Sequence, residues 1–144
     1  METVPHDILH RINTDRKILS VHSRKAEDDV FQNLIENKIK VAIFHWYTGS
    51  ISVLEKIVNN NYYISVNPAM IKSRAGQEII NTVPLENILA ESDGPFVRIG
   101  NREVKPTDIR QVYEYIASKK GCDYSVVNKT INNNFFKLIH WVKG

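Results

Sequence analysis

The stretch Val41 to Trp46 (VAIFHW) is an apolar run that ends in a metal-binding type of side chain, His45. The run Ile18 to Val21 is followed by His22, and a third apolar run is followed by Asp93. Each run is long enough for one β-strand, and the stretches between them have the apolar spacing of helices. We therefore expect strands and helices to alternate.

Parallel β/α folds bring the carboxyl ends of their strands to one edge of the sheet, which in a closed barrel is a single mouth. Side chains far apart in the sequence meet there. Imidazole and carboxylate groups bind divalent metals, and such metals serve many hydrolases. The pattern predicts an α/β fold of the TIM-type (β/α)8 barrel with a metal-dependent hydrolase site at the strand ends.

Four strands are expected, each a nearly continuous apolar run of the kind that is buried on both faces of a parallel sheet. They are Ile18 to Val21, Val41 to Phe44, Tyr62 to Val66 and Ile88 to Ala90. Helical spacing predicts the helices. These are Pro5 to Arg16, Lys25 to Asn37, Ser50 to Asn59, Gly76 to Asn81, Thr107 to Ser118, Tyr124 to Lys129 and Asn132 to Val142, with a loop from Pro95 to Lys105.

The composition of the 144 residues, 42% hydrophobic and 24% charged, is that of a globular domain. A net charge of +3 is compatible with a polyanionic substrate, although many other proteins are equally basic. The single cysteine, Cys122, excludes an internal disulfide. No apolar run reaches the ~18 residues of a membrane span, and no signal peptide is recognisable. We expect a cytoplasmic protein.

Motifs around these residues resemble one known family. His22-Ser23-Arg24 (HSR), His45 to Ser50 (HWYTGS), Tyr63 to Val66 (YISV) and Glu91 to Phe96 (ESDGPF) resemble, in order and spacing, the TatD family of metal-dependent deoxyribonucleases. Trp46, Asn67 to Met70 and Gly94 to Phe96 look closest to the TatD-like proteins of Qat anti-phage defence systems. That branch implies a defence role, with defence-system proteins as partners.

The family barrel has roughly 250 residues, and its first metal ligands are a His-x-His pair and a bridging glutamate, which this sequence lacks. The resemblance implies that residues 1–144 form a single TatD-like domain, the C-terminal half of the barrel, with strands ending near His22, His45, Val66 and Glu91. We expect a shortened sequence, a late start codon, or a split or decayed gene. A separately encoded N-terminal half or a second copy would complete the barrel.

The resemblance assigns His22, His45 and Asp93 to metal binding, and Asp93 also to catalysis, as the base beside the attacking water. Glu91 is expected to orient a histidine. Simpler roles stay open for both acids, because Asp93 could cap a turn and Glu91 could be a charge at a strand end.

Arg24, Trp46 and Tyr47 are the expected substrate contacts. The planar guanidinium of Arg24 can pair with a phosphate or with an acidic neighbour. The two aromatic rings can stack on a base or pack within the protein. His140 lies on a predicted helix outside any motif, so we expect it to be a surface or packing residue.

Together these residues imply a TatD-like metal-dependent hydrolase, a deoxyribonuclease or phosphodiesterase that acts on DNA with two divalent ions, Mg, Mn or Zn. Two alternatives stay open, an amidohydrolase-type enzyme on a small molecule and a non-catalytic half-barrel that serves as a binding subunit. The family's Arg-Asn-x-Pro motif near the phosphate is replaced by Arg102 to Pro106. Because the His-x-His pair and the bridging glutamate are missing, the sequence does not decide whether this chain is active by itself.

Overall fold

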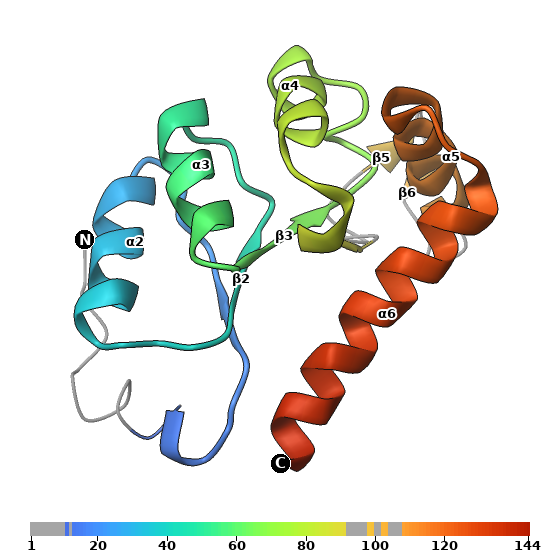
Figure 1. Ribbon diagram of the computed structural model, residues 1–144. Coiled ribbons are helices and arrows are strands. Elements are labelled where there is room, and N and C mark those ends of the chain that lie inside the picture. The colour runs from blue at the N-terminus through green and yellow to red at the C-terminus, as the bar shows by residue number, and fades with distance from the viewer. Residues whose placement is uncertain (1–10, 12, 92–97, 100–101, 104–107) are drawn as a thin grey trace.

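The structure is a computed structural model that describes residues 11, 13–91, 98–99, 102–103 and 108–144. Its centre is a four-stranded parallel sheet in the order β1-β2-β3-β4 (Figure 1). The strands are β1 (Leu19–Val21), β2 (Ala42–His45), β3 (Tyr63–Val66) and β4 (Ile88–Ala90). All four agree with the expected strands to within one residue at each end, because short apolar runs between helices favour parallel strands.

The helices alternate with the strands. They are α2 (Glu27–Glu36), α3 (Ile51–Asn59), α4 (Arg74–Thr82), the 3₁₀ helix η1 (Leu85–Asn87), α5 (Ile109–Lys120) and α6 (Tyr124–Lys143). Ser50 caps α3 as expected, since its hydroxyl accepts a hydrogen bond from the Val53 N–H. The expected helix Pro5 to Arg16 lies largely outside the described residues. Among those described, no helix is both long and apolar enough to cross a membrane.

Two expectations for the C-terminal third are wrong. The sequence predicts two helices where α6 is one helix of 20 residues. The helix continues because Val127, Ile131, Asn134 and Leu138 are buried along one face, and Asn134 uses its side-chain amide to bond the carbonyls of Leu85 and Ile88. The expected loop Pro95 to Lys105 contains a short antiparallel pair, β5 (Arg98–Ile99) and β6 (Arg102–Glu103).

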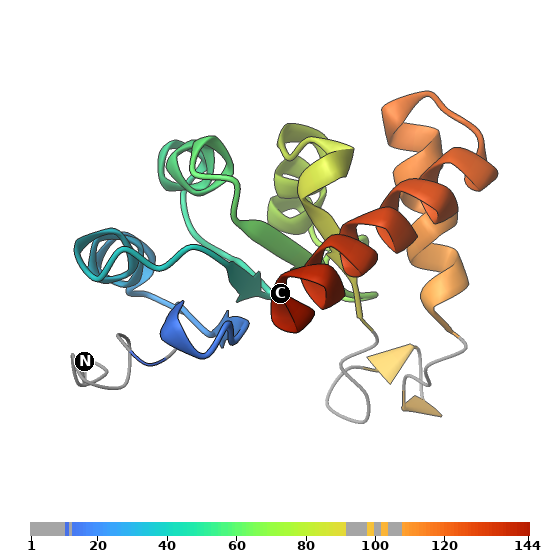
Figure 2. The ribbon, with the colours of Figure 1, turned by 60° about the horizontal axis from the view of Figure 1, so that its bottom comes forward.

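Helices cover the outer face of the sheet. In Figure 2, α2, α3, α4 and α5 form an arc around the strands, and α6 crosses the opposite, inner side. The residues that the strands present to the arc are completely buried. They are Ala42, Phe44, Ile64, Val66 and Ile88. At ~25 cal/mol per Å² of apolar surface, this burial is the main source of stability of the fold.

The inner face is covered less completely. Alternation along the strands and the register place Ser20, Ile43, Ser65 and Leu89 on this face. A cavity of about 340 Å³ lies here, and α6 contributes Phe135 and other residues to its wall. The sheet therefore has a closed apolar side and a side with accessible polar groups.

Candidate functional site

Two histidines meet at the carboxyl ends of adjacent strands. His22 directly follows β1 and His45 is the last residue of β2. Their ring centroids lie 4.3 Å apart, with the ring planes at 69°. His22 is exposed, and the side chain of His45 is 13% exposed. The parallel pairing of β1 with β2 thus brings together two residues that are distant in the sequence.

Glu91 lies beside His45. It follows β4, and its backbone N–H donates to the carbonyl of Val66 at 2.9 Å, which extends the ladder by one residue. Its Oε2 is 2.5 Å from Nδ1 of His45. Because an ionised carboxylate only accepts hydrogen bonds, this contact requires a proton on Nδ1. A carboxylate in such a contact can orient an imidazole, and this role of Glu91 stays a prediction.

Ser65 was not singled out in the sequence, although it completes this cluster. It lies opposite His45 in the register of β2 and β3 and is 4% exposed. Its hydroxyl donates to Oε1 of Glu91 at 2.8 Å. One signal was available, since Ser65 is the polar residue on the inner face of an otherwise apolar strand.

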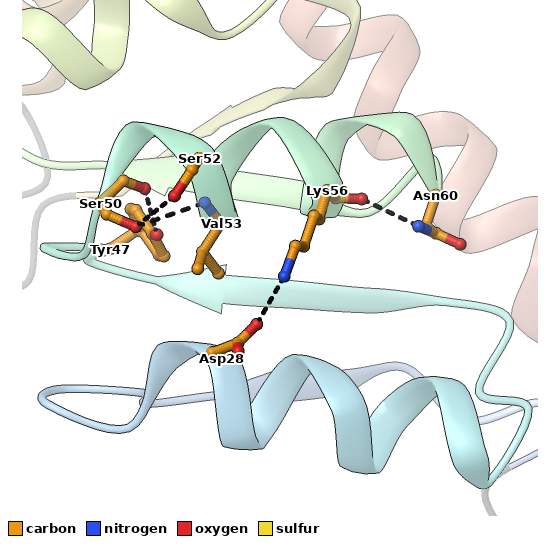
Figure 3. A network of polar contacts seen from close by, with 7 residues as sticks. All are labelled: Asp28, Tyr47, Ser50, Ser52, Val53, Lys56 and Asn60. Carbon is orange, nitrogen blue, oxygen red and sulfur yellow. Dashed lines mark hydrogen bonds and ion pairs between the residues drawn. The ribbon is translucent and has the colours of Figure 1, made fainter.

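Tyr47 points into the core, which favours the packing role that the sequence left open for this ring. It is 1% exposed and its hydroxyl donates to the carbonyl of Ser50 at 2.7 Å (Figure 3). Burial, and next the charge of Glu27, raise the pKa of Tyr47 well above its usual range. A side chain at Gly49 would collide with both Glu27 and Tyr47, so the loop needs glycine there.

Arg24 and Trp46 remain near the strand ends. Arg24 is exposed two residues beyond His22, and Trp46 is half-buried next to His45. The backbone of Trp46 has a φ of +46°, a left-handed conformation that costs a bulky residue roughly 1 to 2 kcal/mol. Such conformations persist where the surrounding structure enforces them, and they concentrate at functional sites.

The remaining expected ligand, Asp93, lies outside the described residues. Within the described part of the chain, no group of three or more histidine, cysteine or acidic side chains has a geometry that could hold a metal ion. What the structure shows is a pair of imidazoles, one of them in contact with a carboxylate. Two neutral imidazoles are suitable partial ligands for a divalent transition metal or zinc.

Known proteins resemble this chain over nearly its whole length. Residues 11–140 match the family described as TatD related DNase. The human deoxyribonuclease TATDN3 is 31% identical over 124 residues, which cover 83% of this chain and 44% of the relative. The uncharacterised metal-dependent hydrolase YcfH of Escherichia coli is 28% identical over 142 residues, covering 92% of this chain and 54% of the relative.

Solved structures share the fold. YJJV, a TatD homologue from Escherichia coli K12, superimposes with a TM-score of 0.82 at 19% identity, over 90% of this chain and 52% of that protein. The chain spans about half the length of the curated relatives it matches. Its parallel sheet with surrounding helices is accordingly part of a (β/α) barrel. On the family match and the shared fold, the chain belongs to the TatD related DNase family.

Proposed function

We propose that this protein is a metal-dependent deoxyribonuclease and that this chain forms the C-terminal half of its barrel. The observation that carries the proposal is the pair His22 and His45, 4.3 Å apart between ring centroids at the carboxyl ends of β1 and β2. In parallel β/α barrels this end of the sheet is where active sites lie. Similarity to a named deoxyribonuclease supports DNA as the substrate.

His22 and His45, together with Asp93, would hold a divalent ion such as Mg, Mn or Zn. A bound ion would supply a Lewis acid for the scissile phosphate and a water of lowered pKa. The described residues fit this role in one testable respect. Glu91 accepts a hydrogen bond from Nδ1 of His45, so the proton is on Nδ1 and the lone pair that a metal requires is on Nε2. Asp93 is proposed as a ligand and as the base.

Arg24 and Trp46 are the proposed substrate contacts on this chain. Arg24 is exposed close to the histidine pair, where its guanidinium can reach a phosphate oxygen. Trp46 is only half-buried, and an indole ring in such a position can stack on a base. Burial makes Tyr47 the weakest of the three expected contacts, because a base can reach its ring only if the loop is displaced.

A second half of the barrel would supply the His-x-His pair and the bridging glutamate of the family. β1 and β4 are the two edge strands of the described sheet. The outer side of β1 can pair with a further strand, whereas at β4 the amide of Asn134 already bonds the carbonyl of Ile88. That half would belong to the same protein, to a separate polypeptide, or to a second copy. The motifs shared with the Qat branch extend the proposal to anti-phage defence in the cytoplasm.

A non-catalytic binding subunit is the second candidate. This candidate is favoured by the number of metal ligands. Among the described residues only the pair His22 and His45 comes together as possible ligands, and a two-metal site needs more ligands than these two. An amidohydrolase-type activity on a small molecule is the third. It remains compatible with the fold, since the same barrel serves many chemistries.

A hydrolysis assay separates these candidates. The purified chain is incubated with single-stranded DNA and with Mg²⁺, Mn²⁺ or Zn²⁺, first alone and then with the N-terminal half of a TatD barrel added. We expect little cleavage alone, cleavage after complementation, and loss of that cleavage in His45→Ala. Metal binding without cleavage of DNA under either condition would contradict the nuclease and favour the binding subunit or the small-molecule enzyme.

A further inference from the structure

Ser65 is a buried hydroxyl at the centre of the inner face. It is 4% exposed, and its neighbours in register are His45 on β2 and Leu89 on β4. Its Oγ is 2.8 Å from Oε1 of Glu91 and 3.4 Å from Nδ1 of His45. β2, β3 and the residue that follows β4 thus contribute one polar group each to a single cluster. Two of the three, Ser65 and Glu91, line the cavity.

The protons in this cluster can be assigned from the chemistry of the groups. A serine hydroxyl donates one proton. The serine donates this proton to Oε1 of Glu91, which is the shorter of its two contacts, because hydrogen bonds to a charged acceptor are the stronger ones. Nδ1 of His45 must then be the donor to Oε2 of Glu91 at 2.5 Å, and at 3.4 Å Ser65 can only accept from the same N–H.

We propose that Ser65 is a positioning residue for the metal ligand His45, an inference that rests on the proposed function. The terminal torsion of a glutamate is broad, so a carboxylate at a strand end has no intrinsic reason to face an imidazole. The hydroxyl of Ser65 fixes Oε1, which turns Oε2 toward Nδ1 of His45. His45 is thereby held as the Nδ1–H tautomer, with the lone pair on Nε2.

The side chain of Ser65 is not needed to fill space, because it borders a cavity of about 340 Å³. A serine that only packed there could be replaced by alanine without effect on the imidazole. If Ser65 positions Glu91, its replacement by alanine should disturb the imidazole. Glu91 is 25% exposed, so its carboxylate can turn to water once Oε1 is released. The two roles therefore differ in what happens to the His45 ring.

The tautomer of His45 is the decisive measurement. In the metal-free chain with ¹⁵N-labelled histidine, two-bond ¹H–¹⁵N correlations report which nitrogen is protonated. They are recorded at increasing pH until the pattern no longer changes. His45→Gln identifies the signal. We expect the Nδ1–H form in the wild type, a shift toward the Nε2–H form in Ser65→Ala, and recovery in Ser65→Thr, which keeps the hydroxyl.

Ser20→Ala is the matched control, because it deletes the same group from an exposed position on the same face. Ser65→Cys keeps the volume and donates weakly, so it should show the shift even if Ser65→Ala unfolds. An unchanged His45 tautomer in folded Ser65→Ala or Ser65→Cys, with melting curves like those of the wild type, would overturn the proposal.

Cobalt(II), followed by its visible absorption, gives the second measurement. Ser65→Ala should weaken cobalt binding about tenfold, as loss of a group that orients a metal-bound histidine does, and Ser65→Thr should restore it. If the wild type binds no cobalt, the proposed metal site fails, whereas the tautomer still decides whether Ser65 positions His45. A tautomer shift without any loss of cobalt affinity would overturn the role in metal binding.

Discussion

The two faces of the sheet differ in what they bury. On the outer face, Phe44 and its neighbours are completely enclosed by α2 to α5. On the inner face Ile43, one residue earlier, is only partly buried, and Ser20 and His22 are exposed. The outer face is therefore the main source of stability, and the inner face carries the polar groups.

Polar groups on the inner face are stabilised by one another. A buried polar group without a partner costs roughly 1 to 3 kcal/mol. Ser65, Glu91 and His45 avoid this cost by bonding in sequence across three strands. A site built in this way needs little apolar burial of its own, provided that the outer face fixes the strands. Four predictions test this division between the two faces.

The largest effect is expected on the outer face. Phe44→Ala removes a ring that is 0% exposed and in contact with Tyr47 and Tyr62, so the free energy of unfolding should fall by about 3 to 5 kcal/mol. Ile43→Ala, on the inner face, should cost roughly 1 to 2 kcal/mol because it is only partly buried. Urea unfolding of both variants makes the comparison. Equal losses would show that the inner face is as fully packed as the outer.

The second effect belongs to the inner face. His22→Ala or His45→Ala should lower the affinity for a divalent metal by at least roughly 100-fold, the upper end of the loss for groups that only orient a ligand. In the absence of metal, the stability of His22→Ala should change little, because His22 is exposed. His45→Ala should cost roughly 1 to 3 kcal/mol, because it removes the hydrogen-bond partner of Glu91. His140→Ala is the control, since His140 is exposed on α6. Isothermal titration with Zn²⁺ measures the affinity of the histidine variants and of the control. An equal loss of affinity in His140→Ala would contradict the assignment of His22 and His45 as metal ligands.

The third prediction concerns alkaline pH and the outer core. Burial and the charge of Glu27 raise the pKa of Tyr47, and burial raises that of Tyr62. A raised pKa means that the folded state keeps the proton, so this stability is complete below the unfolded pKa of about 10 and is lost as the pH rises toward the folded value. The loss approaches about 1.4 kcal/mol per pH unit for each such tyrosine.

Chemical denaturation between about pH 8 and pH 11 measures this slope. Tyr47→Phe should make the decline above about pH 10 shallower, at the expense of its hydrogen bond to Ser50, which is worth about 1 kcal/mol. An identical slope in the wild type and in Tyr47→Phe would show that Tyr47 ionises as readily in the folded as in the unfolded chain.

The smallest effect is expected at the surface of the helical layer. Lys56 on α3 reaches Asp28 on α2 at 3.0 Å (Figure 3), but both side chains are about half exposed. A double-mutant cycle of Lys56→Ala and Asp28→Ala should give a coupling below about 1 kcal/mol that shrinks with added salt. A larger coupling would mean that this ion pair, and not burial, holds the two helices together.

The order of the elements could be predicted from the sequence because it depends on local properties. The runs that become β1 to β4 are apolar and short, and Ser50 caps its helix through contacts within four residues. α6 was predicted wrongly for the opposite reason. Its continuity depends on Asn134, whose amide bonds Leu85 and Ile88, far away in the sequence.

The sequence by itself determined which titratable side chains lie at the strand ends, since His22, His45 and Glu91 all follow apolar runs. Only the tertiary structure decided that Ser65 joins Glu91 to His45 and that Tyr47 points into the core. The physical reason is that contacts between strands depend on register and on which face a residue occupies. Packing of the whole sheet sets both, and a shift by one residue would reverse every side chain.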